Sequence, residues 1–151
     1  MSILTYPALL SDIPTLDRIA RACEKIAPSS LGWVRRDSME RAYEAGCLNI
    51  AQLDAQTVGF ILWSNPTRGA NKGYRVVHTL AVHPDHQRKG IGRALLGDLL
   101  LPVRLKCPVT VGKDNRANLA NSFYAALGLT FIRTDVTKAG RQLNVWEKAA
   151  H

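Results

Sequence analysis

The segment Val76–Leu96 constrains the fold more than any other part of this 151-residue chain. It opens with a nearly continuous β-branched and apolar run, Val76–Val82, which is typical of a buried central strand. A basic, glycine-containing turn, Gln87–Gly92, follows and leads into a leucine-rich helical pattern. Such a junction presents unpaired backbone N–H groups and the positive end of a helix dipole. The segment therefore predicts a strand–turn–helix unit whose turn binds an anion, and its layout suits a diphosphate.

Two blocks of the sequence resemble the GNAT superfamily of acyl-CoA-dependent N-acetyltransferases. The turn matches the family's acyl-CoA signature, Q/R-x-x-G-x-G/A, with Gln87, Gly90 and Gly92 at its fixed positions. Further along, Ala120–Leu129 reads ANSFYAALGL and is similar to the family's helix A-x-x-F-Y-x-x-L-G-F. The two blocks come in the family's order, and the resemblance covers about residues 76–134.

This resemblance implies that acetyl-CoA is bound as the acyl donor. The backbone amides of Gln87–Arg93 would hold the diphosphate, because the two glycines of the signature let it approach the main chain. The N–H groups at the end of the preceding strand would polarise the thioester carbonyl. The family often has a cofactor-binding asparagine where this chain has Ala117, and Asn115 and Asn118 stand nearby. The expected cofactor-binding residues are Leu80, Ala81, Val82, Gln87, Arg88, Lys89, Gly90, Ile91, Gly92, Arg93, Asn115 and Asn118.

The resemblance also implies two catalytic residues, Tyr124 and His78. Tyr124 matches the phenol that protonates or stabilises the departing CoA thiolate. His78 matches the histidine that serves as base, through water, in the serotonin acetyltransferase branch, in the pattern His-x-Leu-Ala-Val. A base is useful because an alkylamine with a pKa of about 10.4 is mostly protonated at neutral pH, so exposing its lone pair costs roughly 4–5 kcal/mol. Two structural alternatives stay open, a core tyrosine and a histidine hydrogen-bonded within the sheet. Strand alternation predicts that His78 and Leu80 share a face.

Neither an acyl-enzyme nor a metal site is indicated. The sequence contains no serine or cysteine in a nucleophile motif, which favours direct attack by the amine in a ternary complex. His83 and His86 have a metal-like spacing without an evident third ligand, so we expect no metal. The three cysteines are widely spaced and suggest no disulfide framework.

Turn signals and periodicity divide the remaining sequence into helices and hairpins. Helices are expected from about Ser11 to Pro28 and from about Arg36 to Ala45, with Gly46 as a left-handed terminator. Leu48–Trp63 reads as a hairpin. A second hairpin is expected to join Leu129–Thr134 with Leu143–Glu147. The helix after the basic turn is expected to bury Leu95, Leu96, Leu99 and Leu100 and to stop at Pro102.

These elements predict an α+β fold built as one domain over residues 1–151. Its sheet should be mixed and mostly antiparallel, with six to seven strands and about four flanking helices. In the resembled fold the central strands, here 76–82 and 105–111, splay apart. The arm of the cofactor then adds to the exposed strand edge as a peptide would. Acceptor specificity should come from Leu31–Arg36 and from the loop Ser64–Arg75.

The positive charge of the chain is concentrated in its second half. Residues 1–67 contain six Lys/Arg and seven Asp/Glu, whereas residues 68–151 contain fourteen and five. Such a field would steer a phosphate-bearing ligand, although a solvated basic surface or nucleic-acid binding would also fit. No membrane span or signal peptide is apparent, so we expect a cytoplasmic protein without a membrane partner.

The leading interpretation is therefore an acetyl-CoA-dependent N-acetyltransferase acting on a small amine or an amino-terminal group. A nucleic-acid-directed enzyme that acetylates aminoacyl-tRNA, as some bacterial toxins of this family do, is a second interpretation. A non-catalytic domain that senses acyl-CoA or binds a partner is a third. The sequence leaves a homodimer open.

Overall fold

The structure, a computed structural model, describes residues 2–26, 35–108, 124–140 and 142–149. Seven strands in this part of the chain form one sheet in the order β1-β2-β3-β4-β5-β7-β6. Neighbouring strands run antiparallel, except for the parallel pair β4 and β5. The predicted α+β class and the mixed, mostly antiparallel sheet are confirmed. The strands are β1 (Ile3–Pro7), β2 (Leu48–Leu53), β3 (Gln56–Ser64), β4 (Arg75–Val82), β5 (Val103–Pro108), β6 (Thr130–Val136) and β7 (Gln142–Lys148).

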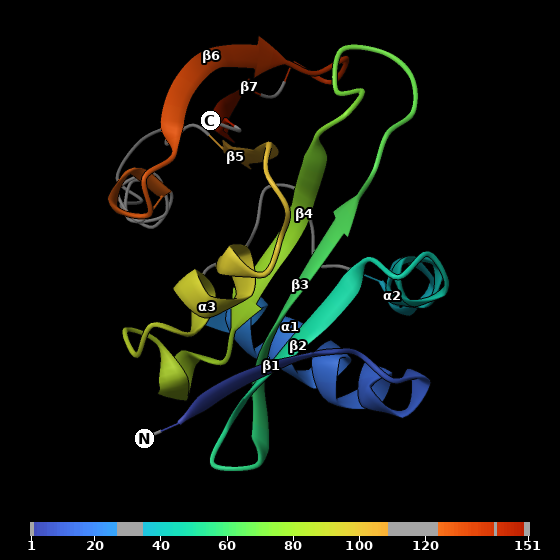
Figure 1. Cartoon of the computed structure of the whole chain (residues 1–151), viewed down its shortest axis with the longest axis vertical. Helices are drawn as coiled ribbons and strands as arrows, with labels where there is room; N and C mark the ends of the chain where they lie inside the picture. The colour runs from blue at the N-terminus through green and yellow to red at the C-terminus, as the bar shows by residue number, and fades with distance from the viewer. Residues whose placement is uncertain (1, 27–34, 109–123, 141, 150–151) are drawn as a thin grey trace.

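Helices cover both faces of the sheet. α1 (Ile13–Ile26) and α2 (Arg36–Glu44) pack on one face, and α3 (Ile91–Gly97) packs on the other (Figure 1). We call these the α1 face and the α3 face. Two short 3-10 turns, η1 (Leu10–Asp12) and η2 (Pro84–His86), precede α1 and the basic turn. No helix within the described ranges is long and apolar enough to cross a membrane.

α1 and α2 each bury one apolar face. In α1 these residues are Ile13, Leu16, Ile19 and Ala20. α2 buries Met39 and Ala42, and Gly46 follows it in the left-handed region with φ +72°. A glycine accepts this conformation without the steric cost that a Cβ imposes. The buried residues of both helices form a core with residues of β2 and β3 on the α1 face.

On the α3 face, one glycine lets helix and sheet approach closely. Gly59 lies in β3, opposite Val82 of β4. A Cβ at Gly59 would stand 2.9 Å from the carbonyl oxygen of Ala81 and 3.3 Å from Cγ2 of Ile91. Ile91 and Leu95, both fully buried, pack where that side chain would be. The absence of a side chain in β3 thus brings the start of α3 against the sheet.

The ladder between β4 and β5 is short. It joins Arg75–Val77 to Val103–Leu105 and ends there, after which β5 pairs only with β7 in the described part of the chain. This confirms the predicted splay of the two central strands. β5 begins at Val103, earlier than expected, and residues 109–111 of the predicted strand lie outside the described residues.

The helix after the basic turn is shorter than predicted. α3 ends at Gly97, and Leu100 is 70% exposed. Leu95, Leu96 and Leu99 are buried as expected. Glycine is a weak helix former, and Pro102 disfavours helix at the residue before it. The helix therefore ends at Gly97, and Leu99 is buried from the turn that follows it. The prediction that Leu100 is buried was wrong.

The second hairpin is confirmed, because β6 pairs with β7 in antiparallel register. Ahead of it, residues 124–126 are helical and Gly128 has a φ of +86°. This agrees with the helix that the second family block, Ala120–Leu129, predicts. The earlier part of that predicted helix, up to residue 123, lies outside the described residues.

Gly59→Ala should destabilise the protein, because its new Cβ meets backbone rather than a flexible side chain. We expect a loss of about 1–3 kcal/mol in the free energy of unfolding, measured by denaturant titration. The matched control is Gly97→Ala at the end of α3, where an added Cβ meets nothing within 4 Å. That change should be neutral or stabilise by up to about 1 kcal/mol. Equal effects of the two substitutions would contradict the close packing described for Gly59.

Candidate active site

The split between β4 and β5 brings the predicted site residues of β4 to an open strand edge. Leu80, Ala81 and Val82 pair with β3, beyond the last residue pair that joins β4 to β5. The side chains of Leu80 and Val82 pack on the α3 face, while Ala81 is buried on the α1 face. This stretch is anchored to β3 on one side and, among the residues that the structure describes, pairs with no strand on the other. It can therefore receive an extended ligand as an additional strand.

The carbonyl oxygen of Val82 ties three elements together where β4 ends. It accepts hydrogen bonds from Nε2 of Gln87, at 3.2 Å, and from Sγ of Cys23 in α1, also at 3.2 Å. The side chain of Gln87 therefore braces the turn against the strand. The sequence gave no indication of this contact, because a single cysteine among apolar helix residues usually indicates core packing.

The basic turn has two residues in the left-handed region. Arg88 has a φ of +65° and Gly90, the N-cap of α3, has a φ of +85°. Gly90 suits its conformation, whereas Arg88 holds it at a steric cost of about 1 kcal/mol. Strained backbone of this kind is concentrated at ligand-binding turns. The family signature marks Gly90 but gives no indication of the conformation of Arg88.

The side chains of the turn divide into exposed basic groups and buried anchors. Arg88 and Arg93 are exposed, and Nζ of Lys89 lies 3.3 Å from Nδ1 of His86. Ile91 and Gly92 are buried in the first turn of α3. Any contact that these two residues make with a ligand must therefore come from their backbone. Asn115 and Asn118 lie outside the described residues.

A basic pocket opens on the α1 side of the same turn. Its volume is about 420 Å³, and it is lined by Arg18, Arg21, Ala22, Lys25, His83, Pro84 and Asp85. Three of these residues are cations from α1, and one is a carboxylate. Arg21 is also paired with the buried Asp17, at 3.4 Å. The pocket can therefore bind an anion. Within the described ranges, no cluster of three His, Cys, Asp or Glu side chains is suited to a metal ion.

Tyr124 lies on the α3 face. It is half-buried and packs against the core that contains the α3 residues. Its ring centroid is 6.5 Å from that of Trp146, which in turn is 5.9 Å from Phe131. The ring of Tyr124 thus packs against apolar side chains while the residue stays partly exposed. This position fits both a core residue and an acid.

His78 lies in a β-bulge of β4. The register between β3 and β4 shifts there, from Trp63↔Val77 to Leu62↔Thr79. Val77 and Leu80 both pack on the α3 face, so the bulge inserts one residue between them. The prediction that His78 and Leu80 share a face is therefore wrong, because simple alternation does not hold through a bulge. Nε2 of His78 instead lies 2.7 Å from Oγ of Ser64.

The surroundings of His78 favour its neutral form. Desolvation by burial lowers the pKa of the imidazole below its ordinary 6.5, and the positive charge of Lys106 lowers it further. At neutral pH the ring is uncharged and can accept a proton. Ser64, at the end of β3, can orient this ring. The sequence gave no indication of Ser64 or Lys106, because the split and the bulge that bring them to His78 are tertiary features.

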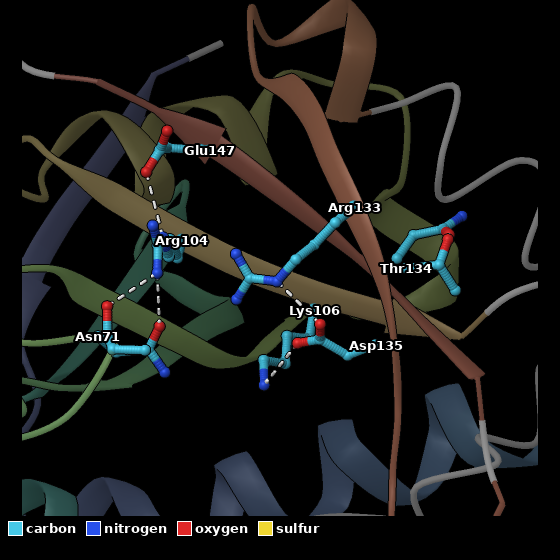
Figure 2. A network of polar contacts seen from close by, with 9 residues as sticks. Asn71, Arg104, Lys106, Arg133, Thr134, Asp135 and Glu147 are labelled. Atoms are coloured by element: carbon cyan, nitrogen blue, oxygen red, sulfur yellow. Dashed lines mark hydrogen bonds and ion pairs between the residues drawn. The ribbon is translucent and has the colours of Figure 1, made fainter.

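An arginine of β5 fastens the middle of the predicted acceptor loop Ser64–Arg75 (Figure 2). Arg104 donates from Nε to Glu147 at 3.1 Å and from Nη1 to the carbonyl oxygen of Ala70 and to Oδ1 of Asn71, both at 3.0 Å. Its guanidinium also lies 3.9 Å from the centroid of the Tyr74 ring. A hydrogen bond with Tyr74, followed by Arg104, lowers the pKa of Glu147. The loop is therefore fastened to the sheet beside the split.

Comparison with known proteins identifies this arrangement. The family model described as "Acetyltransferase (GNAT) domain" matches residues 44–129, more than half of the chain. The chain belongs to the GNAT acetyltransferase family. The matched region includes the split, the bulge and the basic turn. A comparison with curated proteins found no match.

Solved structures with the same fold cover nearly all of this GNAT chain. Ard1 from Thermoplasma volcanium is 18% identical, with a TM-score of 0.74 and full coverage of both chains. PaiA N-acetyltransferase from Thermoplasma acidophilum, solved with coenzyme A, is 19% identical with a TM-score of 0.64, and the match covers 98% of this chain and 100% of that one. Arabidopsis thaliana Naa50, solved with the bisubstrate analogue CoA-Ac-MVNAL, is 16% identical with a TM-score of 0.69, and the match covers 99% and 100%. At these identities the likeness shows a shared fold.

Removing the contacts that Arg104 makes with Glu147 and with the loop Ser64–Arg75 should lower the stability of the protein. Arg104→Met leaves the carboxylate of Glu147 without its guanidinium, and both side chains are largely buried, at 12% and 17% exposed. We expect a loss of about 1–3 kcal/mol in the free energy of unfolding, measured by denaturant titration at pH 7. Arg68→Met, an exposed cation of the same loop, is the control and should change little.

The pH dependence of the free energy of unfolding tests the same contact between Arg104 and Glu147. Because the folded pKa of Glu147 is depressed, its stabilisation is complete above the unfolded value of about 4.5 and is lost as pH falls through the folded pKa. Glu147→Gln should therefore flatten the fall in stability below that pH. An unchanged acid limb would show that this carboxylate is not stabilised as described.

Proposed function

We propose that this GNAT protein transfers an acetyl group from acetyl-CoA to an amine, either a small molecule or an amino-terminal group, by direct attack in a ternary complex. The whole chain, residues 1–151, would form one such domain. The observation that carries the proposal is the open edge of β4, which ends in a turn with Arg88 and Gly90 in left-handed conformations. Donor and acceptor can meet at this split.

The donor site would combine the strand edge with the turn. Backbone groups of Leu80–Val82 would bind the acyl arm and polarise the thioester carbonyl. Amides of Gln87–Arg93 would bind the diphosphate, with added charge from Arg88, Lys89 and Arg93. The complexes of PaiA with coenzyme A and of Naa50 with a CoA–peptide analogue support this assignment. Asn115 and Asn118 remain predicted contacts.

The reaction would need one base and one stabiliser of the leaving group. The amine nitrogen attacks the thioester carbon, its N–C bond forms, and the C–S bond then breaks to release a thiolate. The proton that the amine loses would pass to Nε2 or Nδ1 of His78, directly or through water. The hydroxyl of Tyr124 would hydrogen-bond or protonate the sulfur. His78 and Tyr124 belong to opposite faces of the sheet, which suits an acceptor and a donor that approach from different sides.

The first test is transfer itself, read as free thiol released from acetyl-CoA in the presence of an amine panel. Tyr124→Phe removes the hydroxyl and keeps the ring against Trp146. We expect turnover to fall by about 10²-fold or more, the scale of a lost transition-state donor, with the melting-temperature shift produced by acetyl-CoA retained. Wild-type turnover in this variant would remove Tyr124 from the mechanism. No thermal shift and no thiol release by the wild type would overturn the proposed function.

The second test is the pH profile of His78→Ala. The wild type should keep its rate down to a pH below 6.5, because the pKa of the imidazole is lowered. His78→Ala should lose rate at neutral pH and recover part of it in alkali, where more of the amine is neutral. Ser64→Ala is the matched variant, since it removes the 2.7 Å contact but leaves the imidazole. It should slow the reaction less. A pH profile unaffected by His78→Ala would exclude the base role.

A further inference from the structure

Two basic residues, one on β5 and one on β6, lie on either side of β7 on the α1 face, next to the split. Lys106 of β5 pairs with Val145 of β7, and Arg133 of β6 pairs with the same Val145. Leu105 belongs to the α3 core, so alternation puts Lys106 on the opposite face. Figure 2 shows the side chain of Arg133 reaching from β6 towards β5, where Lys106 lies. The two cations therefore gather on one patch.

This patch carries more positive charge than its carboxylates balance. Asp135 forms an ion pair with each of the two cations. Its Oδ1 lies 2.8 Å from Nε of Arg133, and its Oδ2 lies 3.6 Å from Nζ of Lys106. The neighbouring pair, Arg104 and Glu147, is neutral as a unit. Arg133 also helps to lower the pKa of Glu147. The two groups of charges therefore interact electrostatically with each other. Among these five ionised side chains, three cations share two carboxylates.

The two cations have both exposure and hydrogen-bonding capacity for a ligand. Their side chains are 36% and 41% exposed. A guanidinium has five N–H donors and an ammonium has three, while the contacts with Asp135 use one nitrogen of each. A carboxylate can engage a guanidinium through two parallel hydrogen bonds and an ammonium through one.

The patch lies beside the proposed base. The β4–β5 ladder ends at Val77↔Leu105, so Lys106 and His78 are the next residues on either side of the split. Lys106 also acts electrostatically on the His78 imidazole. An amine delivered to His78 therefore comes close to this positive charge. A purely cationic acceptor would be repelled there, whereas an anionic group near the amine would be attracted.

We propose that Lys106 and Arg133 form a carboxylate-recognition site for the acceptor, and that the acceptor is an amine that also carries a carboxylate. The inference rests on the proposed acetyltransferase function and specifies its substrate class. Amino acids and peptides with an acidic residue near the amino terminus share this chemistry. The cations would bind the carboxylate and leave the amine at the split.

The test compares matched acceptors that differ by one carboxylate. Alanine against alaninamide represents free amino acids, and amidated peptides beginning Ser-Asp against Ser-Asn represent amino-terminal acceptors. Rates are expressed per neutral amine, because a carboxylate raises the pKa of a nearby amine. For the wild type we expect kcat/KM to favour the acidic member of at least one pair by about tenfold or more. The pair that shows the preference identifies the source of the carboxylate.

Variants then link the preference to the patch. Lys106→Gln and Arg133→Gln should each remove most of it by raising KM for the acidic acceptor, with KM for acetyl-CoA unchanged. Lys106→Glu should reverse the preference, which loss of stability alone would not do. Lys138→Gln, which neutralises an exposed lysine in the turn after β6, is the control and should keep the wild-type ratio.

The outcomes separate the two levels of the proposal. Thiol release with equal efficiency on both members of each pair would overturn carboxylate recognition and leave the acetyltransferase function standing. A preference that survives Lys106→Glu, or variants that change only the melting temperature, would also overturn it. A wild type that acetylates no amine would overturn the proposed function together with this inference.

Discussion

The structure depends on an interruption of backbone pairing between β4 and β5. Three residue pairs hold the two strands in register, and beyond them each strand keeps its partner on the other side. The sheet stays intact because β3 and β7 continue to satisfy one edge of each strand. Beyond Val77 and Leu105, the facing edges of β4 and β5 pair with no other strand of the described residues, and we propose that they receive the ligand.

The two faces of the sheet have separate cores, and the site draws on both. α3 packs closely on one face because Gly59 has no side chain, and this packing positions the turn that precedes the helix. The bulge at His78 directs the imidazole to Ser64 and Lys106. The reacting groups of donor and acceptor can therefore be supported by independent cores, while Cys23 links α1 to the end of β4.

Much of the fold could be predicted because its signals are local. The helices α1 and α2, the left-handed Gly46 and both hairpins follow from periodicity and turn chemistry. The end of α3 could not, because Leu99 and Leu100 look alike in sequence and only packing separates the buried residue from the exposed one. The face of His78 was mispredicted for a similar reason, since a bulge has no signature in a run of β-branched residues.

The sequence by itself determined the family, through a glycine-spaced basic turn after an apolar strand and a second block further along. Those features are chemical, because the turn needs backbone freedom at fixed positions whatever surrounds it. Tertiary structure alone decided which side chains meet. Ser64, His78, Lys106, Arg133 and Asp135 come from four strands, β3 to β6, and converge through register, a bulge and a split. Arg133 and Asp135 are neighbours on β6, but their charge balance with Lys106 and His78 is a property of that convergence, because no spacing along the chain brings the strands together.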